Sequence, residues 1–206
     1  MAQELLDQSD YALVAGQACL DLANTVGGLR GAQTTEYLGG YADFAGWATQ
    51  AQLVGKATGR ALAELALTRP EPAARIFARV VAVREAIYAL FSAVAAERRV
   101  PAEALAAINA ELPDAMGRVQ VEATRGGFEW KVREEGAELE LPLQAVVRET
   151  AELLTSGRLD RVRECAGDTC GWLFLDETRN HSRQWCDMRG CGNRAKVRRH
   201  RARHRR

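Results

Sequence analysis

The chain of 206 residues has a formal net charge of only +1, with 28 Lys and Arg against 27 Asp and Glu. No stretch approaches the 18 uncharged apolar residues of a membrane span, and the first ten residues have neither the basic nor the apolar region of a secretory signal. These features exclude a membrane protein and a secreted disulfide scaffold, so we expect a cytoplasmic protein with reduced cysteines.

Charge is distributed unevenly along the chain. From Arg161 onward there are 13 basic and five acidic residues, a net charge of +8, which leaves the preceding part at −7. Such an acidic body with a basic end predicts an anionic partner for the end. The 206 residues are enough for one medium domain followed by a small one.

The first third of the chain mixes short apolar runs with helical patterns. Residues 11–26 contain apolar runs and one Gly, and we predict a short strand pair or a strand that leads into a turn, followed by a glycine-rich loop at 27–31. Apolar residues at helical spacing predict a helix over 41–54, and a second, Ala- and Leu-rich helix over 59–68.

The longest predicted helix covers 72–98 and carries a continuous apolar stripe, which we expect to face the core. Arg84 lies near the centre of that stripe. Because an unpaired buried charge is very costly, we predict that Arg84 is buried or paired.

After Pro101 we predict another helix to about Leu112. Period-two alternation over 119–123 and 128–132, around a glycine-bearing turn, predicts a β-hairpin, and 142–156 predicts a last helix ended by Gly157. The expected fold class is therefore α+β: a mainly helical body with short β-hairpins over 1–158, followed by a small zinc-binding module over 159–206.

Four cysteines lie in that module as two pairs at matched spacing, separated by fifteen residues: Cys165, Cys170, Cys186 and Cys191. Two such pairs supply the four thiolates of a tetrahedral zinc site, which leaves no open position and is therefore structural rather than catalytic. A unit of fewer than 50 residues usually needs a metal or disulfides to fold, and zinc supplies that need. The remaining cysteine, Cys19, is expected to be a buried free thiol.

Local features predict how the module is built. We expect a strand near 159–163, a left-handed turn at Gly167, a second strand after Trp172, and a helix that begins at Cys191, which together describe a treble-clef-like finger. Three aromatic side chains lie so near the ligands that we expect them to form the core of the finger: Trp172, Phe174 and Trp185.

The motifs resemble a known family. The sequences Cys165-x4-Cys170, Arg183-Gln184-Trp185-Cys186 and Cys191-Gly192-Asn193-Arg194 are similar to the CGNR zinc finger, and Cys19 to Thr25 is similar to the start of the ABATE domain that precedes this finger in bacterial proteins. The resemblance implies one structural Zn²⁺, an N-terminal α/β domain, and a role in stress-induced transcription regulation.

The segment after the last cysteine is dominated by arginine, which pairs bidentately with phosphate and with guanine. At helical spacing the arginines fall on two faces of one helix. We predict that this helix binds double-stranded DNA through the following residues: Arg183, Asn193, Arg194, Lys196, Arg198, Arg199, Arg201, Arg203 and Arg205. His181, His200 and His204 are expected to lie outside the metal site, the last two as further phosphate contacts.

Two alternatives stay open for the finger, which could bind RNA or another protein, since the fold alone does not decide. For the body we predict no enzyme, because it has no histidine and no convergent catalytic set. A small-molecule effector or a protein partner could bind the body at Asp21, Asn24, Thr25 and Arg84. The competing interpretation is structural: Asp21 and Asn24 satisfy backbone groups and Arg84 closes the network. The sequence does not set the oligomeric state.

Overall fold

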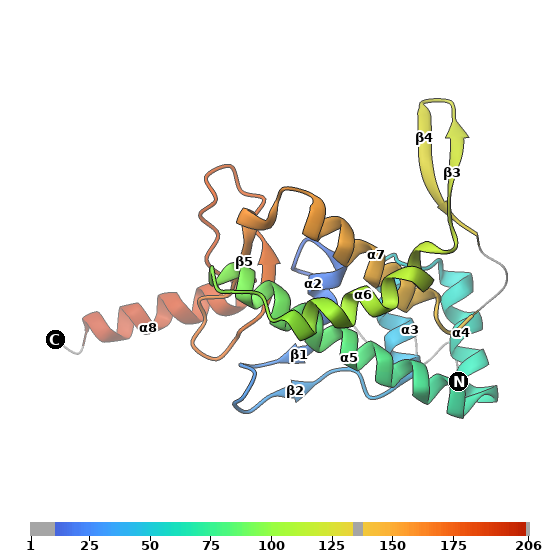
Figure 1. The fold of residues 1–206 in the computed structure, drawn as a ribbon. Helices are drawn as coiled ribbons and strands as arrows, with labels where there is room; N and C mark the ends of the chain where they lie inside the picture. The colour runs from blue at the N-terminus through green and yellow to red at the C-terminus, as the bar shows by residue number, and fades with distance from the viewer. Residues whose placement is uncertain (1–10, 134–137, 205–206) are drawn as a thin grey trace.

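A computed structural model describes residues 11–133 and 138–204. Helices dominate the body, which among the described residues also has two antiparallel strand pairs, and a third pair lies in the finger (Figure 1). In chain order the elements of the body are α2 (Ala18–Ala23), β1 (Val26–Gly27), β2 (Thr35–Glu36), α3 (Tyr41–Gln50), α4 (Lys56–Thr68), α5 (Pro70–Ala95), α6 (Ala102–Met116), β3 (Val119–Thr124), β4 (Gly127–Val132) and α7 (Leu141–Thr155). No helix within the described residues is both long and apolar enough to span a membrane.

The long helix α5 runs through the middle of the body and packs against α2, α3, α4, α6 and α7. Its predicted apolar stripe faces the core: Ile87, Leu90 and Phe91 are completely buried, as are Phe44 and Trp47 of α3. The helices predicted from periodicity are thus confirmed. Their ends differ by a few residues, most clearly in α6, which continues through Pro113 to Met116.

The prediction of a short strand pair, or of a strand that leads into a turn, over residues 11–26 is wrong. The segment Ala18–Ala23 is a short helix, α2, and only Val26–Gly27 forms a strand, which pairs with the unpredicted strand β2. All the residues of α2 from Cys19 to Ala23 are buried. A helix that is buried on every side shows no clear 3.6-residue period, so its sequence resembles a buried strand.

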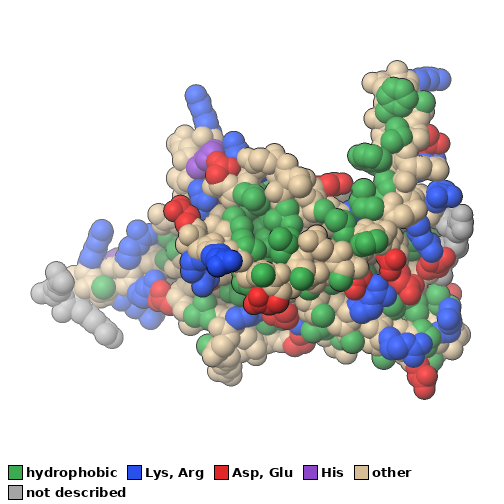
Figure 2. Space-filling model, viewed as in Figure 1, with side chains coloured by type: hydrophobic (Ala, Val, Ile, Leu, Met, Phe, Trp, Pro, Cys, Tyr) green, Lys and Arg blue, Asp and Glu red, His purple; other side chains and the backbone are tan. Residues whose placement is uncertain are grey.

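Strands β3 and β4 form the predicted hairpin, in perfect antiparallel register from the Val119–Val132 pair to the Thr124–Gly127 pair. The hairpin projects from the end of α6 and stands clear of the helices (Figure 1). We refer to residues 118–133 as the arm. Its apolar side chains are largely exposed, which Figure 2 shows as hydrophobic surface along the projection.

The finger follows α7. Residues Leu159–Arg161 form a 3-10 turn rather than the start of a strand, and the strand β5 (Val162–Glu164) pairs with β6 (Leu173–Leu175). A π-helical turn, Met188–Gly192, leads into α8 (Asn193–Arg203), so the regular α-helix begins two residues after Cys191. This hairpin followed by a helix is the predicted treble-clef-like arrangement.

Finger and body share one hydrophobic core. Leu173, Phe174 and Leu175 are buried in the same apolar cluster as the helices α2, α5 and α7. Backbone hydrogen bonding continues across the junction, since Leu175 N donates to Ala15 O at 2.8 Å. The finger is therefore held rigidly against α2, and its helix α8 points away from the body (Figure 1).

Candidate metal centre and nucleic-acid interface

The four cysteines of the finger converge on one point. Their sulfur atoms all lie within 4.8 Å of one another, and all four residues are buried and free of disulfides. The Sγ–Sγ distances are 3.6 Å for Cys170–Cys186 and 3.7 Å for Cys186–Cys191. Tetrahedral Zn²⁺ with bonds of about 2.3 Å places its sulfur ligands about 3.8 Å apart, so the cluster fits one structural zinc ion.

The acid–base chemistry of the cluster suits a bound cation. Hydrogen bonds from Cys170 and Cys186 lower the pKa of the Cys165 thiol, and the same contacts raise the pKa of the two donors. Thiols so close together cannot all ionise unless a positive charge compensates them. Zinc binds cysteine as thiolate and supplies that charge.

Neighbouring groups hold the sulfurs in place. Cys186 N donates to Cys165 Sγ at 3.3 Å, and Arg194 Nη2 donates to Cys191 Sγ at 3.0 Å. Such contacts around a metal ligand orient the ligand and delocalise its charge. Gly167 is required for a different reason from the predicted left-handed turn, because a Cβ atom there would lie 3.2 Å from Cys191 Sγ. The glycine makes room for the cluster.

The second ligand pair is built into the start of the helix. Asp187, directly after Cys186, accepts hydrogen bonds from Arg189 N and Gly190 N. This carboxylate caps the turn that carries Cys191 and stabilises the positive end of the helix dipole. The turn Met188–Gly192, which contains the zinc ligand Cys191 and leads directly into α8, thereby links zinc binding to the start of the helix.

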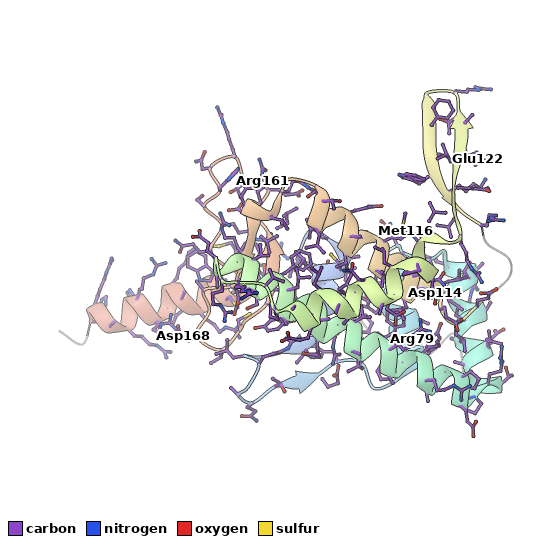
Figure 3. All side chains as sticks on the ribbon, in the orientation of Figure 1. Arg79, Asp114, Met116, Glu122, Arg161 and Asp168 are labelled. Carbon is purple, nitrogen blue, oxygen red and sulfur yellow. The ribbon has the colours of Figure 1, made fainter. Side chains whose placement is uncertain are left out.

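Helix α8 contacts the finger along one side only. Ala195 is its single buried residue, and on either side of it Arg198 pairs with Asp168 while Arg199 lies over the Trp185 ring at 5.9 Å. Figure 3 shows Asp168 beneath the first part of the helix. The rest of the helix circumference faces solvent.

The outward residues of α8 fall into three rows at 100° per residue. One basic row contains Arg194 and Arg201, and the opposite basic row contains Lys196 and Arg203. Between these rows, on the side away from Ala195, lies what we call the outer ridge: Asn193, Val197, His200 and His204. An open groove along the helix is lined by Arg194 and Arg201 of the first row and by Asn193 and Val197 of the ridge. Arg189, from the turn that precedes α8, also lines it.

The predicted nucleic-acid residues are therefore not equivalent. Arg183 is half-buried, donates to Val14 O, Trp185 O and Cys186 O, and lies over the Phe174 ring, so its guanidinium is occupied inside the protein. Arg205 lies outside the described residues. Val197, half-exposed at the centre of the outer ridge, is not among the residues that the sequence predicts to bind nucleic acid. A valine among arginines does not stand out as a possible base contact until the buried side of the helix is known.

The four predicted ligand-binding residues of the body are buried and have protein partners. Asp21 Oδ1 accepts from Val14 N and Ala15 N, each at 2.9 Å. Asn24 exchanges two hydrogen bonds with the backbone of Leu173 in the finger, at 2.8 and 2.9 Å. These contacts favour the structural interpretation, in which the polar residues of α2 hold the finger. Ligand binding at these residues stays a prediction.

The charged residue Arg84 is buried and paired, as predicted. Its guanidinium forms two hydrogen bonds of 2.7 Å to the Glu36 carboxylate and a third to Glu85. It also contacts Thr25 Oγ1 at 3.3 Å, whereas Thr25 donates to Leu22 O. The partner carboxylate Glu36 comes from strand β2, which the sequence did not indicate.

The remaining cysteine and the histidines lie apart from the metal cluster. Cys19 is a completely buried free cysteine, as predicted, and burial raises the pKa of its thiol. The rings of His200 and His204 lie side by side on α8, tilted by 45° with centroids 4.1 Å apart, and His181 is exposed. The four-cysteine cluster contains none of them.

These observations define a zinc-finger protein in which a helical α+β body supports a four-cysteine finger. The chain belongs to the ABATE family: the family model, described as "Putative stress-induced transcription regulator", matches residues 16–157. The model of the CGNR zinc finger matches residues 161–204, which include all four zinc ligands. Neither description names an enzymatic activity. No curated protein matches the chain.

Proposed function

We propose that this protein is a transcription regulator that binds double-stranded DNA by inserting α8 into the major groove. One observation carries the proposal: the two outward basic rows of α8 lie on opposite sides of the helix, with the non-acidic outer ridge between them. A helix with cations on both flanks fits a site with anions on both walls.

The dimensions agree with such a site. An α-helix with its side chains is about 10–12 Å across, and the major groove of B-DNA is about 12 Å wide with phosphates along both edges. The eleven residues of α8 give the helix a length of about 16 Å along the groove. Arg194 and Arg201 would face one phosphate backbone, and Lys196 and Arg203 the other. A flat anionic surface would engage only one of these rows.

The outer ridge would then face the base edges. Asn193 carries an amide that can pair with adenine, and Val197 offers a methyl contact to thymine. His200 and His204 add donors beyond them along the same ridge. We therefore infer that base selection, where it occurs, resides in Asn193 and Val197, and that affinity resides in the basic rows.

The alternative of RNA binding is less well supported. The major groove of A-form RNA is too narrow for a helix, and single-stranded RNA is bound by exposed aromatic side chains. In the finger, Phe174 is buried, and Trp172 and Trp185 pack against the core. A finger that binds an acidic protein remains the competing outcome of the experiment below.

The test is a fluorescence-anisotropy titration of the zinc-loaded protein with a short random-sequence duplex at several salt concentrations. If about six phosphates are neutralised, log K should fall with log salt at a slope near −5. The variant Arg201→Ala/Arg203→Ala removes one cation from each row and should reduce the slope by about 2.

A matched control separates the helix from net charge. Lys56→Ala/Arg75→Ala also removes two exposed cations, but from α4 and the first part of α5 at the opposite end of the molecule (Figure 1). Its slope should equal that of the wild type. Absence of binding at low salt, or an equal loss in both variants, would contradict the proposal and favour a protein-binding finger.

A further inference from the structure

The arm has two unlike faces. Cross-strand partners share a face, so Val121 lies beside Trp130, and Ala123 beside Phe128. The other face carries the pairs Gln120–Lys131 and Glu122–Glu129, with Lys131 ion-paired to Glu122. One face is therefore apolar and the other polar, the pattern of a hairpin that covers a core.

The apolar face of the arm covers nothing within the described part of the chain. Phe128 is 81% exposed, Trp130 69% and Val121 58%, and each strand of the arm packs chiefly against the other. An isolated two-stranded hairpin is marginally stable in water. The two aromatic side chains alone expose about 300 Å² of apolar surface, which on a monomer indicates an interaction site.

The solvent-facing side of α6 continues this surface. Leu105 is 42% exposed and Met116 45% exposed. They are eleven residues apart and so lie on one face of the helix, with the half-buried Leu112 between them. Met116 lies where α6 meets the arm (Figure 3). The arm and the exposed face of α6 thus form one bent apolar surface with two limbs.

The two limbs are alike in polarity, since each presents a row of exposed apolar side chains. The three acidic residues of α6, Glu103, Glu111 and Asp114, lie on the opposite side of the helix from Leu105 and Met116, so α6 places no acidic side chain in its apolar row. Glu111 and Asp114 are also ion-paired to Arg79 of α5. The apolar face of an arm is therefore complementary in polarity to an α6 face, which is the other limb of the same surface.

We propose that two copies of this chain associate through the arm, with the arm of each copy lying along the exposed face of α6 of the other. A two-fold axis makes this exchange reciprocal, so both limbs of both copies are covered at once. A standard interface buries about 800 Å² per partner. The arm aromatics, Val121 and the α6 row supply most of an apolar area of that size.

The experiment is sedimentation equilibrium of the full-length, zinc-loaded protein. The wild type should be a dimer. The arm variant Val121→Asp/Phe128→Asp should weaken dimerisation by about 100-fold or more, because it places charges in the centre of the interface. Gln120→Asp/Thr124→Asp adds the same charge to the polar face and should remain dimeric. Circular dichroism and zinc content confirm that each variant is folded.

A mixing experiment tests where the arm binds. Leu105→Arg, on the exposed face of α6, should also give a monomer. Mixing it with the arm variant should restore a heterodimer, since one intact arm then meets one intact α6 face. A monomeric wild type at all concentrations would overturn the proposal and assign the arm to a different partner. A dimeric wild type whose two variants do not complement each other would exclude the contact between arm and α6.

Discussion

Two segments project from the body, the arm and α8, and they are built in opposite ways. Helix α8 is fixed at its first turn by the cysteine cluster and the Asp187 cap, and it presents charge around most of its circumference. Each strand of the arm packs chiefly against the other, and the arm is apolar on one face. A segment with charge on both flanks requires a partner that surrounds it, whereas a one-sided apolar face requires a single complementary surface.

Of the changes considered, loss of zinc should have the largest effect, and it should affect α8 but not the arm. Cys186→Ser removes one ligand, and structural zinc contributes about 10–16 kcal/mol to the folding of small modules. We expect loss of the helical signal of α8 and of measurable DNA binding, while association through the arm persists. Cys19→Ala, which changes a buried thiol outside the cluster, should keep one zinc per chain. Full DNA binding by the zinc-free serine variant would contradict this assignment.

The next largest effect is expected on stability, at the junction where Asn24 of the body binds the backbone of the finger. Asn24→Ala leaves both the N–H and the C=O of buried Leu173 without their partners. The free energy of unfolding should fall by about 2–4 kcal/mol, as measured by denaturant titration of the zinc-loaded protein. Asn180→Ala, an exposed asparagine of the finger, should change it little. An unchanged stability in Asn24→Ala would favour the ligand-binding interpretation of this residue.

The outer ridge of α8 should govern base preference rather than overall affinity. Asn193→Ala and Val197→Ala should each alter the sequences selected from a random duplex library, with a loss of discrimination of about 1–3 kcal/mol at the contacted base pair. Lys196→Ala, in a basic row, should instead weaken binding to all sequences alike. Identical selected sequences for the wild type and both ridge variants would leave α8 as a non-specific phosphate contact.

The smallest expected effect is an increase in DNA affinity rather than a loss. Asp168 forms an exposed ion pair with Arg198 and places a negative charge beside α8. Asp168→Ala should therefore raise DNA affinity about two- to threefold, within the range of surface ion pairs. Asp160→Ala removes the same charge from another exposed position of the finger and should have less effect. Weaker DNA binding in Asp168→Ala would show that the ion pair positions the helix.

The sequence predicted the features that local patterns encode. Helices α3 to α7 show apolar residues at helical spacing because each has one buried and one exposed side, and the spacing of the four cysteines follows from the geometry of the metal. The buried state of Arg84 also followed from its place on an apolar stripe. Its partner did not, since Glu36 lies 48 residues away in the chain.

Other features depend on tertiary contacts that the sequence does not display. Helix α2 is buried on every side, so its period is hidden. Arg183 has the same chemistry as the arginines of α8, and only the position of Phe174 and of the Val14 carbonyl shows that it stabilises the finger. The hairpin was predicted from alternation, but alternation does not reveal that the apolar face lacks a covering surface.

The central claim is that α8 alone contacts DNA while the arm contacts a second copy of the chain. The most direct measurement is the change of backbone amide NMR shifts when a short duplex is added to the zinc-loaded protein. We predict large changes at Arg189 and across residues 193–203, and none in the arm at 118–133. Shift changes centred on the arm, or an absence of change in α8, would contradict the account.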